Sequence, residues 1–500
     1  MLTAPDRAPY HPCGMTLSID TDHLRRILSA SLPPGVRAAE LFIESRISLR
    51  VSLSPGDAGA APRAERRWET GAHLRRFSAG RHESFVLDAP RGESLEALCL
   101  HPEAIGIEWL SGRTPIGVPR PVEGFGIEAI LSDASPANPG GPWSSASLDS
   151  SVLLLREWLD DLSRRMAGRP GPAPSIGAAI EASLQEILVV ATDRDPARDT
   201  RSFVDATLWA RVLRPEGGAR MLRETRSAPS IADLAARSRG PAAGRTAADA
   251  LAARLIRAPE AVASPRGEMP VVFASPSGGF LLHEICGHLL EADHVLRGAS
   301  PFVGARGRVI ASPLLTLADD GSIPGMRGST LFDDEGVAAR RTPLIMEGVL
   351  VGYLSDRLTS FATDGISTGN GRRQSYREAP MPRMTNLVIQ PGGETFEEIL
   401  RRTDSGLLVE RLGRGQVDPA SGRFALAVEE GFLIERGRAV APVEGAVLRG
   451  RAADLLPSID AVGSDAAADL GSPLCIKEDQ ALPFGILQPT LRVSSMSVSG

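Results

Sequence analysis

The strongest constraint on the fold is the spacing of two histidines in one apolar segment, residues 269–294, which reads MPVVFASPSGGFLLHEICGHLLEADH. The pattern predicts a strand, a turn and then a helix over Phe280–Asp293. His283 and His288 are five residues apart, so a regular α-helix would place them about 140° apart around its axis. A single π-type turn would return both to one face, and Gly287, a weak helix former, would ease that distortion. The sequence therefore predicts a locally irregular helix across this H-E-x-x-x-H motif.

The residue types in this motif are those of a transition-metal site. Three of the eight histidines, His283, His288 and His294, fall within twelve residues, and Glu284 lies among them. Neutral imidazole is a preferred zinc ligand. The apolar neighbours predict a buried helix, in which unpartnered imidazoles would be costly. The alternative is a pair of ordinary histidines on an amphipathic helix, with Glu284 in solvent.

A third protein ligand would have to be a cysteine, an aspartate or a glutamate, because no histidine follows His294. The only cysteine beyond the motif is Cys475, in a turn-like segment. Cys286 lies inside the motif, where we interpret it as a small buried apolar residue.

Length and periodicity divide the chain into segments. Five hundred residues are too many for one ordinary core and predict two or three domains. We expect an N-terminal α+β domain over 15–110, a Pro/Gly-rich connector with an amphipathic helix over 111–175, a central α+β segment over 176–260 and a β-rich domain over 267–500.

Apolar periodicity and turn residues predict the individual elements. Helices are expected at Asp20–Leu32, Asp149–Met166, Ala243–Ile256 and Thr395–Arg402. Strands are expected at Ala38–Leu53, His82–Asp88, Gln185–Ala191 and Phe203–Leu213, and hairpins turn at Glu347–Gly348 and Arg436–Gly437. The chain is therefore expected to be an α+β protein, with an N-terminal region of helices and antiparallel sheet before a β-rich C-terminal domain.

Composition argues against several classes of function and location. The net charge of −6 argues against a generally basic nucleic-acid-binding surface. The sequence has no run of about 20 apolar residues that would span a membrane. Its four cysteines are scattered, and Met1–Asp22 lacks the apolar core of a signal peptide. We therefore expect a cytoplasmic protein.

Beyond the motif, an ordered series of short segments runs through 267–500 and resembles one known family. The chain is similar to the TldD/PmbA family of metalloproteases, and specifically to its TldD-type branch, which carries the H-E-x-x-x-H motif. The matching segments are Met269–Val272, Leu282–Glu284, Gly287–His288, Leu290–Glu291, Asp319–Gly321, Asp333–Gly336, Thr368–Arg373, Pro380–Asn386, Gly415–Asp418, Cys475, Lys477–Glu478 and Gln488–Leu491.

The resemblance implies a barrel-like catalytic domain with one zinc ion per chain, held by His283, His288 and Cys475. It implies that Glu284 is the general base that activates a metal-bound water for attack on a peptide carbonyl. It also implies a dimer, either with the motif-lacking subunit PmbA (TldE) or with a second copy of this chain. Two features depart from the family pattern: Glu291-Ala-Asp replaces the usual Glu-Gly-Asp, and the 111–175 region is expanded.

Four further residues are candidates for supporting the site or binding substrate. Arg372 and Arg373 follow a Gly-Asn-Gly turn and would grip a peptide, although a solvated loop is an equal alternative. Lys477, the only lysine in the chain, would keep the Cys475 thiolate charged or stabilise an oxyanion. Glu291 is the fourth candidate.

The sequence and the resemblance together predict a zinc-dependent metallopeptidase that acts on peptides or unfolded segments. The alternative is a non-catalytic peptide-binding or modulator protein with a structural zinc. A fourth protein ligand would favour the alternative, whereas an open position beside Glu284 would favour catalysis.

Overall fold

The structure is a computed structural model of the 500-residue chain. It describes residues 20–54, 62–78, 81–88, 95, 98–100, 107–108, 145–169, 173–213, 218–239, 246–276, 279–362, 365–469, 471 and 473–500. Residues 111–144 of the expected connector, and residues 243–245 at the expected start of a helix, lie outside the described residues.

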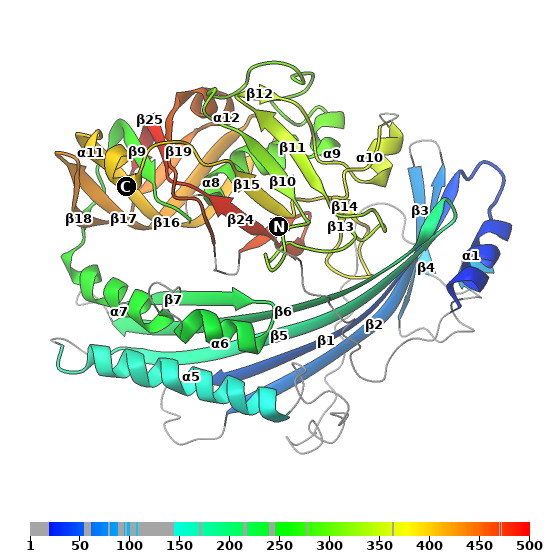
Figure 1. Ribbon diagram of the computed structural model, residues 1–500, viewed down its shortest axis with the longest axis horizontal. Helices are drawn as coiled ribbons and strands as arrows, with labels where there is room; N and C mark the ends of the chain where they lie inside the picture. The colour runs from blue at the N-terminus through cyan, green and yellow to red at the C-terminus, as the bar shows by residue number, and fades with distance from the viewer. Residues whose placement is uncertain are drawn as a thin grey trace, which may run out of the picture.

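Long antiparallel strands build the N-terminal half into one curved sheet (Figure 1). Its order is β4-β3-β2-β1-β5-β6-β7. The strands are β1 Ala38–Leu53, β2 Arg63–Ser78, β3 Arg81–Asp88, β4 Ile107–Glu108, β5 Ser175–Ala191, β6 Arg194–Leu213 and β7 Ala219–Ala228. Because β1 pairs with β5 along most of its length, the 15–110 and 176–260 segments contribute to the same sheet. We therefore propose that these two segments form one domain.

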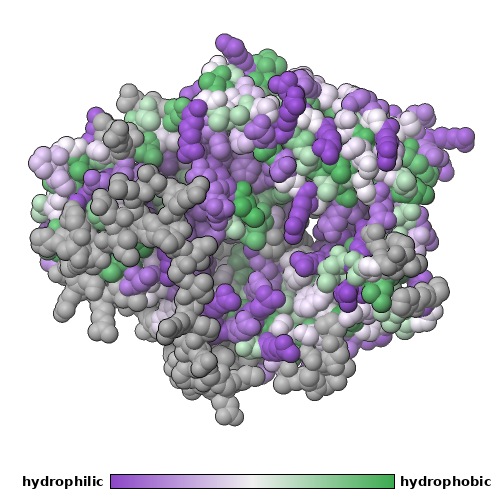
Figure 2. Space-filling model, turned by 180° about the vertical axis from the view of Figure 1, so that it is seen from behind, coloured by the Kyte–Doolittle hydropathy of each residue, from purple (hydrophilic) through white to green (hydrophobic). Residues whose placement is uncertain are grey.

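Helices cover this sheet near its two ends and bury its apolar residues. At one end lies α1 (Thr21–Ala30), with the Asp20 side chain capping its first turn. At the other end, α5 (Ser145–Met166), α6 (Ile231–Arg239) and α7 (Ala247–Arg257) share a core with β1 and β5–β7 (Figure 1). Figure 2 shows the side of the molecule that faces away from the viewer in Figure 1. Hydrophobic residues are scattered among hydrophilic ones on that side.

The C-terminal part contains a closed ring of five strands, so the expected barrel-like β-rich domain is confirmed. The ring runs β16-β9-β25-β19-β17 and closes where β17 pairs back to β16. Its members are β9 Gly267–Phe273, β16 Ser405–Asp418, β17 Arg423–Glu435, β19 Val447–Arg451 and β25 Leu491–Ser499. Strands β8 (Val262–Ala263), β18 (Arg438–Glu444) and β20 (Ile459–Val462) extend this sheet.

A second sheet packs beside the ring, in the order β12-β11-β10-β15-β24-β21. Its strands are β10 Leu317–Asp320, β11 Arg341–Met346, β12 Val349–Leu350, β15 Asn386–Ile389, β21 Ala467–Ala468 and β24 Gly485–Gln488. Two small hairpins stand apart from both sheets: β13 Gly371–Arg372 with β14 Met381–Pro382, and β22 Leu474–Lys477 with β23 Gln480–Pro483. The short helices of this part are α8 Phe280–Leu282, α9 Ala292–Leu296, α10 Arg357–Ala362, α11 Phe396–Arg401 and α12 Ala452–Leu455.

Most of the expected elements are confirmed. Strand β1 has the predicted bounds, and both predicted hairpins turn where expected, with positive φ at both turn residues. Such φ values are typical of the type I′ turn, whose twist matches that of paired strands. Strands β5 and β6 begin earlier than expected. The added residues of β6, 194–202, are mostly polar and lack the apolar alternation that predicts a strand, whereas those of β5, 175–184, do alternate but include many small residues. Among the described residues, no helix combines the length and apolar character needed to cross a bilayer.

Buried ion pairs join the N-terminal sheet to the C-terminal part. Arg75 of β2 donates from Nε to Glu40 Oε1 at 2.8 Å and also contacts Glu335 across the interface. Arg357 reaches the other Glu40 oxygen at 2.6 Å. All four of these side chains are at most 1% exposed, so each charge depends on its partners for solvation.

Replacing Arg75 with methionine is therefore expected to destabilise the protein by about 3–5 kcal/mol, because it removes the buried cation that contacts both Glu40 and Glu335. Urea unfolding of the variant measures this change. The matched control is Arg50→Met on the neighbouring strand, whose ion pair with Glu181 is more than half exposed. That control is expected to lose at most about 1 kcal/mol. Equal losses in the two variants would contradict the importance of the buried pairs.

Candidate metal centre

The segment after β9 folds into an irregular helix that brings the two motif histidines together. Residues 280–282 are α-helical, His283–Gly287 form one π-helical turn, and a short 3₁₀ turn follows before the chain becomes extended at Glu291. The predicted π-type distortion is confirmed. The expected helix over Phe280–Asp293 is α-helical only over Phe280–Leu282 and again from Ala292. The π-helical turn and the 3₁₀ turn between these two parts accommodate the histidine spacing.

Gly287 lies against the side chain of Met384. A Cβ atom at this position would overlap the buried Met384 side chain. The glycine therefore serves close packing as well as the helix distortion for which the sequence suggested it.

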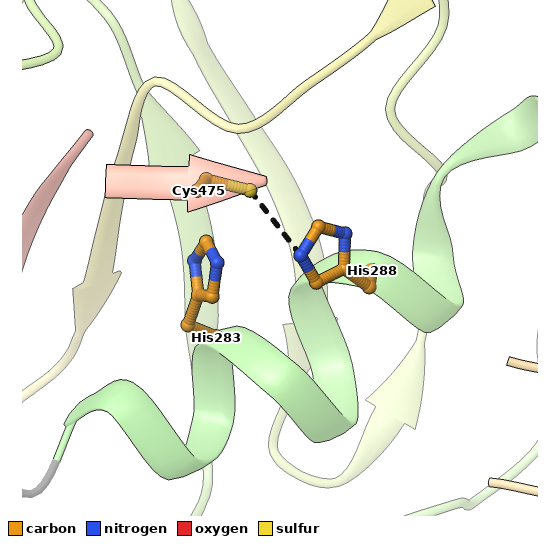
Figure 3. A group of neighbouring side chains, drawn as sticks. All are labelled: His283, His288 and Cys475. Atoms are coloured by element: carbon orange, nitrogen blue, oxygen red, sulfur yellow. Dashed lines mark hydrogen bonds between the residues drawn. The ribbon is translucent and has the colours of Figure 1, made fainter. Parts of the chain in front are cut away.

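The structure brings Cys475 to the two histidines. It lies on β22, and its Sγ is 3.2 Å from His288 Nε2 (Figure 3). One ligand atom from each of His283, His288 and Cys475 lies within 4.8 Å of the others, and all three residues are buried. In Figure 3 the two imidazoles rise from the helix towards the sulfur, which approaches from the facing strand.

This arrangement fits a zinc ion. Zinc binds nitrogen at about 2.0–2.1 Å and thiolate at about 2.3 Å, which separates the two donors by about 3.6 Å at a tetrahedral angle. Both ring nitrogens of His283 are buried, and neither has a hydrogen-bond partner among the described residues. A bound cation would satisfy one of them. Among the described residues, the group offers no fourth His, Cys, Asp or Glu ligand.

Aromatic rings fix the His283 imidazole in place of a hydrogen bond. The Phe484 ring stacks on it with centroids 3.8 Å apart, and the Phe280 ring lies near-parallel at 5.6 Å. Sequence reasoning missed Phe484, because nothing in its local pattern distinguishes it from an ordinary core phenylalanine.

The charge state of Cys475 suits a metal ligand. Burial raises the pKa of its thiol, but the His283 and His288 imidazoles outweigh burial and bring this pKa well below its ordinary value. Burial lowers the pKa of His288, yet the Glu291 carboxylate and the Cys475 thiolate raise it well above its ordinary value. Both shifts favour a thiolate–imidazolium pair in the metal-free protein.

We therefore expect the metal-free protein to show the ultraviolet absorbance of one thiolate at neutral pH. An ordinary thiol ionises only near pH 8.5. Because the pKa of Cys475 is lowered, its charged form persists as the pH falls through neutrality. The absorbance should vanish in Cys475→Ser but remain in Cys286→Ser, because burial raises the pKa of the Cys286 thiol. A thiolate that appears only above about pH 8.5 would contradict this assignment.

Glu284 is buried beside these ligands. Burial raises the pKa of its carboxyl group, while the charges of His283 and His288 lower it; the net shift is upward. A carboxyl group with a raised pKa can both accept and return a proton near neutral pH.

Lys477 lies close to Cys475 in sequence, but its ammonium points to other groups. Its Nζ donates to Glu291 Oε2 at 2.9 Å, to Asp293 Oδ1 at 2.8 Å and to the Pro382 carbonyl at 3.2 Å. An ammonium has only three donors. All three donors are therefore used inside the protein, which leaves none for the Cys475 thiolate or for an oxyanion, the two roles predicted for Lys477.

Arg372 and Arg373 are buried and engaged within the fold, which corrects their expected role as substrate-gripping residues. Arg372 donates to the carbonyls of Met384 and Pro483. Arg373 donates to the Asp334 carbonyl at 3.2 Å and to Glu40 at 3.4 Å. Their donors therefore stabilise the turn and its contact with the N-terminal sheet.

Arg383 is a second residue that sequence reasoning missed. It donates to the carbonyls of Cys475 and Gln480, one on each strand of the β22–β23 hairpin. Its guanidinium thereby fixes the backbone from which the thiol projects.

The chain is similar to known metalloproteases. A family model described as the PmbA/TldA metallopeptidase C-terminal domain matches residues 266–500. A metalloprotease TldD homolog of Haemophilus influenzae is 36% identical over 333 residues, 65% of this chain and 67% of that protein. A second, from Buchnera aphidicola, is 33% identical over 369 residues, 73% of this chain and 74% of that protein.

A solved structure shares the fold. TldE from Thermococcus kodakarensis superposes with a TM-score of 0.69 at 19% sequence identity, covering 96% of this chain and 99% of that one. The likeness covers both the N-terminal sheet and the C-terminal part.

Proposed function

Because this chain belongs to the PmbA/TldD family of metallopeptidases, we propose that it is a zinc-dependent peptidase that hydrolyses peptides or unfolded polypeptide segments. The observation that carries the proposal is the convergence of His283, His288 and Cys475, with Glu284 buried beside them. Imidazole and thiolate donors in one small group favour zinc over the harder cations that prefer oxygen.

In this proposal His283, His288 and Cys475 hold the zinc ion through one atom each. A zinc ion held by three protein ligands supplies Lewis acidity and lowers the pKa of water at its fourth position. Glu284 does not bind the metal. Its carboxylate accepts a proton from the attacking water and delivers it to the leaving amine, a cycle suited to its raised pKa.

A non-catalytic protein with a structural zinc is the competing function. Structural zinc sites are closed by four protein ligands. The described residues offer three ligands here, and the buried carboxyl of Glu284 lies next to them. Both features favour catalysis.

We propose a TldE-like subunit, or a second copy of this chain, as the partner. The shared fold with TldE supports this choice, because two related chains can associate through similar surfaces. Light scattering of the chain alone and with such a subunit tests the proposal, and a monomer under both conditions would refute it.

Removing the metal tests the proposed activity most simply. Dialysis against a chelator is expected to abolish hydrolysis of an unstructured peptide, and one equivalent of zinc per chain should restore it. Hydrolysis that persists in protein shown to be free of metal would refute the proposal.

A further inference from the structure

We propose that Lys477 is a positioning residue for the metal site: its ammonium holds the Glu291 carboxylate in the orientation that fixes the His288 imidazole. This inference rests on the proposed function, because it concerns the same zinc site. It assigns a role to the only lysine in the chain.

A continuous chain of polar contacts leads from the lysine to the ligand. Lys477 Nζ lies 2.9 Å from Glu291 Oε2, and the same oxygen lies 3.1 Å from His288 Nδ1. The other ring nitrogen of His288, Nε2, faces the Cys475 sulfur at 3.2 Å. A carboxylate that accepts the Nδ1 proton fixes the tautomer, so that Nε2 carries the lone pair for the metal.

Glu291 needs the lysine to hold this position. Its side chain is fully buried, and its second oxygen, Oε1, has no hydrogen-bond partner among the described residues. One oxygen therefore carries both contacts. Without a cation beside it, a buried carboxylate would rotate or attract water to regain solvation, and either change would release His288.

The lysine also occupies the place that a second cation would take. Glu291, Asp293 and His294 bring ligand atoms within 4.8 Å of one another, a group that resembles a metal site. The Lys477 ammonium already contacts both carboxylates of this group, at 2.9 and 2.8 Å. We therefore interpret this group as a lysine site that serves the adjacent metal centre.

The two histidine rings are held in place by different kinds of contact, so the loss of Lys477 should affect them differently. Stacked phenylalanine rings fix His283, whose ring nitrogens have no hydrogen-bond partner among the described residues. Polar contacts with Glu291 fix His288. Loss of the lysine should therefore change the binding contributed by His288 and leave that of His283 intact.

Zinc affinity measured by chelator competition tests the role of Lys477. Lys477→Met is expected to bind zinc about 10–100-fold more weakly than wild type, because releasing Glu291 deprives the ligand His288 of its outer partner. In a Glu291→Gln background the same substitution should cost no more than about twofold, because the neutral amide in that background needs no cation. Equal losses in both backgrounds, or an unchanged affinity in Lys477→Met, would overturn the inference.

Arg297→Met is the matched control. Arg297 also contacts Asp293, at 3.6 Å, but it is exposed, and its ion pairs are with Asp293 and Glu478 rather than Glu291. The zinc affinity of the Arg297→Met variant should stay within about twofold of that of the wild type. An Arg297→Met loss as large as that of Lys477→Met would show a general charge effect and overturn the inference.

Cobalt substitution adds a signature that a purely structural role would not alter. The visible absorption of the cobalt-loaded protein reports ligand geometry, and we expect it to shift in Lys477→Met and to match wild type in Arg297→Met. Should Lys477→Met not fold, the nearly isosteric Glu291→Gln variant answers the same question. A wild-type spectrum and zinc affinity in that variant would overturn the inference. Absence of zinc binding by the wild type would instead refute the proposed function.

Discussion

Glu284→Gln is expected to lower the rate of peptide hydrolysis by about 10²–10⁴-fold while the protein retains its zinc. The reason is that the amide has nearly the shape of the carboxylate but cannot accept a proton. Because Glu284 is not among the three grouped ligands, its replacement should leave metal binding intact. The measurement pairs kcat/KM on an unstructured peptide with the zinc content of the same sample.

A nearby exposed carboxylate provides the control for Glu284→Gln. Glu478 lies in the turn after β22, and its side chain is half exposed. Glu478→Gln should hydrolyse the peptide at the wild-type rate. Full activity in Glu284→Gln would exclude this carboxylate as the general base, and loss of zinc in that variant would show that it supports the metal instead.

Cys475→Ala is expected to lose both zinc and activity. The thiolate is one of three donors, so its removal should weaken zinc binding by more than the about 10–100-fold cost of losing an outer partner. The variant should still fold, because Cys475 lies on a small hairpin outside the three large sheets. Zinc affinity, peptide hydrolysis and the unfolding midpoint of the metal-free protein together measure this outcome.

Cys286→Ala is the control for Cys475→Ala, because it removes a neighbouring thiol that is not one of the proposed metal ligands. Cys286 is fully buried in the π-helical turn but is not part of the grouped ligands. The Cys286→Ala variant should lose at most about 1 kcal/mol of stability and keep its zinc. If instead Cys286→Ala lost zinc while Cys475→Ala retained it, the assignment of the third ligand would be wrong.

Local rules explain why the irregular helix could be predicted. Two histidines five residues apart can share a face of a helix only if one turn has the i→i+5 hydrogen bonding of a π-helix. The structure has a π-helical turn at His283–Gly287. Strand β1 was predictable for a similar reason, because its alternation and flanking turn residues are properties of the segment itself.

Long-range pairing could not be predicted in the same way. Strand β5 pairs with β1 more than a hundred residues away, and no local pattern specifies that partner. Arg372 and Arg373 illustrate the same limit at the level of side chains. Their polar context suggested a surface loop, whereas the fold surrounds them with carbonyls and carboxylates from distant segments.

Lys477 shows how position in sequence and position in space diverge. It lies two residues from Cys475 on β22, so the two side chains share a face of the strand. That spacing predicts proximity to the metal site but not the direction of a long flexible side chain. The carboxylates of Glu291 and Asp293 set that direction, and they come from the chain just after the motif helix.

X-ray absorption at the zinc edge measures the ligand set of the metal site. We predict one zinc per chain with one sulfur and two imidazole nitrogens from the protein, and a fourth, light donor from solvent. The same spectrum should lose its sulfur contribution in Cys475→Ala. A zinc ion with four protein ligands, or one without sulfur in the wild-type protein, would contradict a catalytic zinc site built from His283, His288 and Cys475.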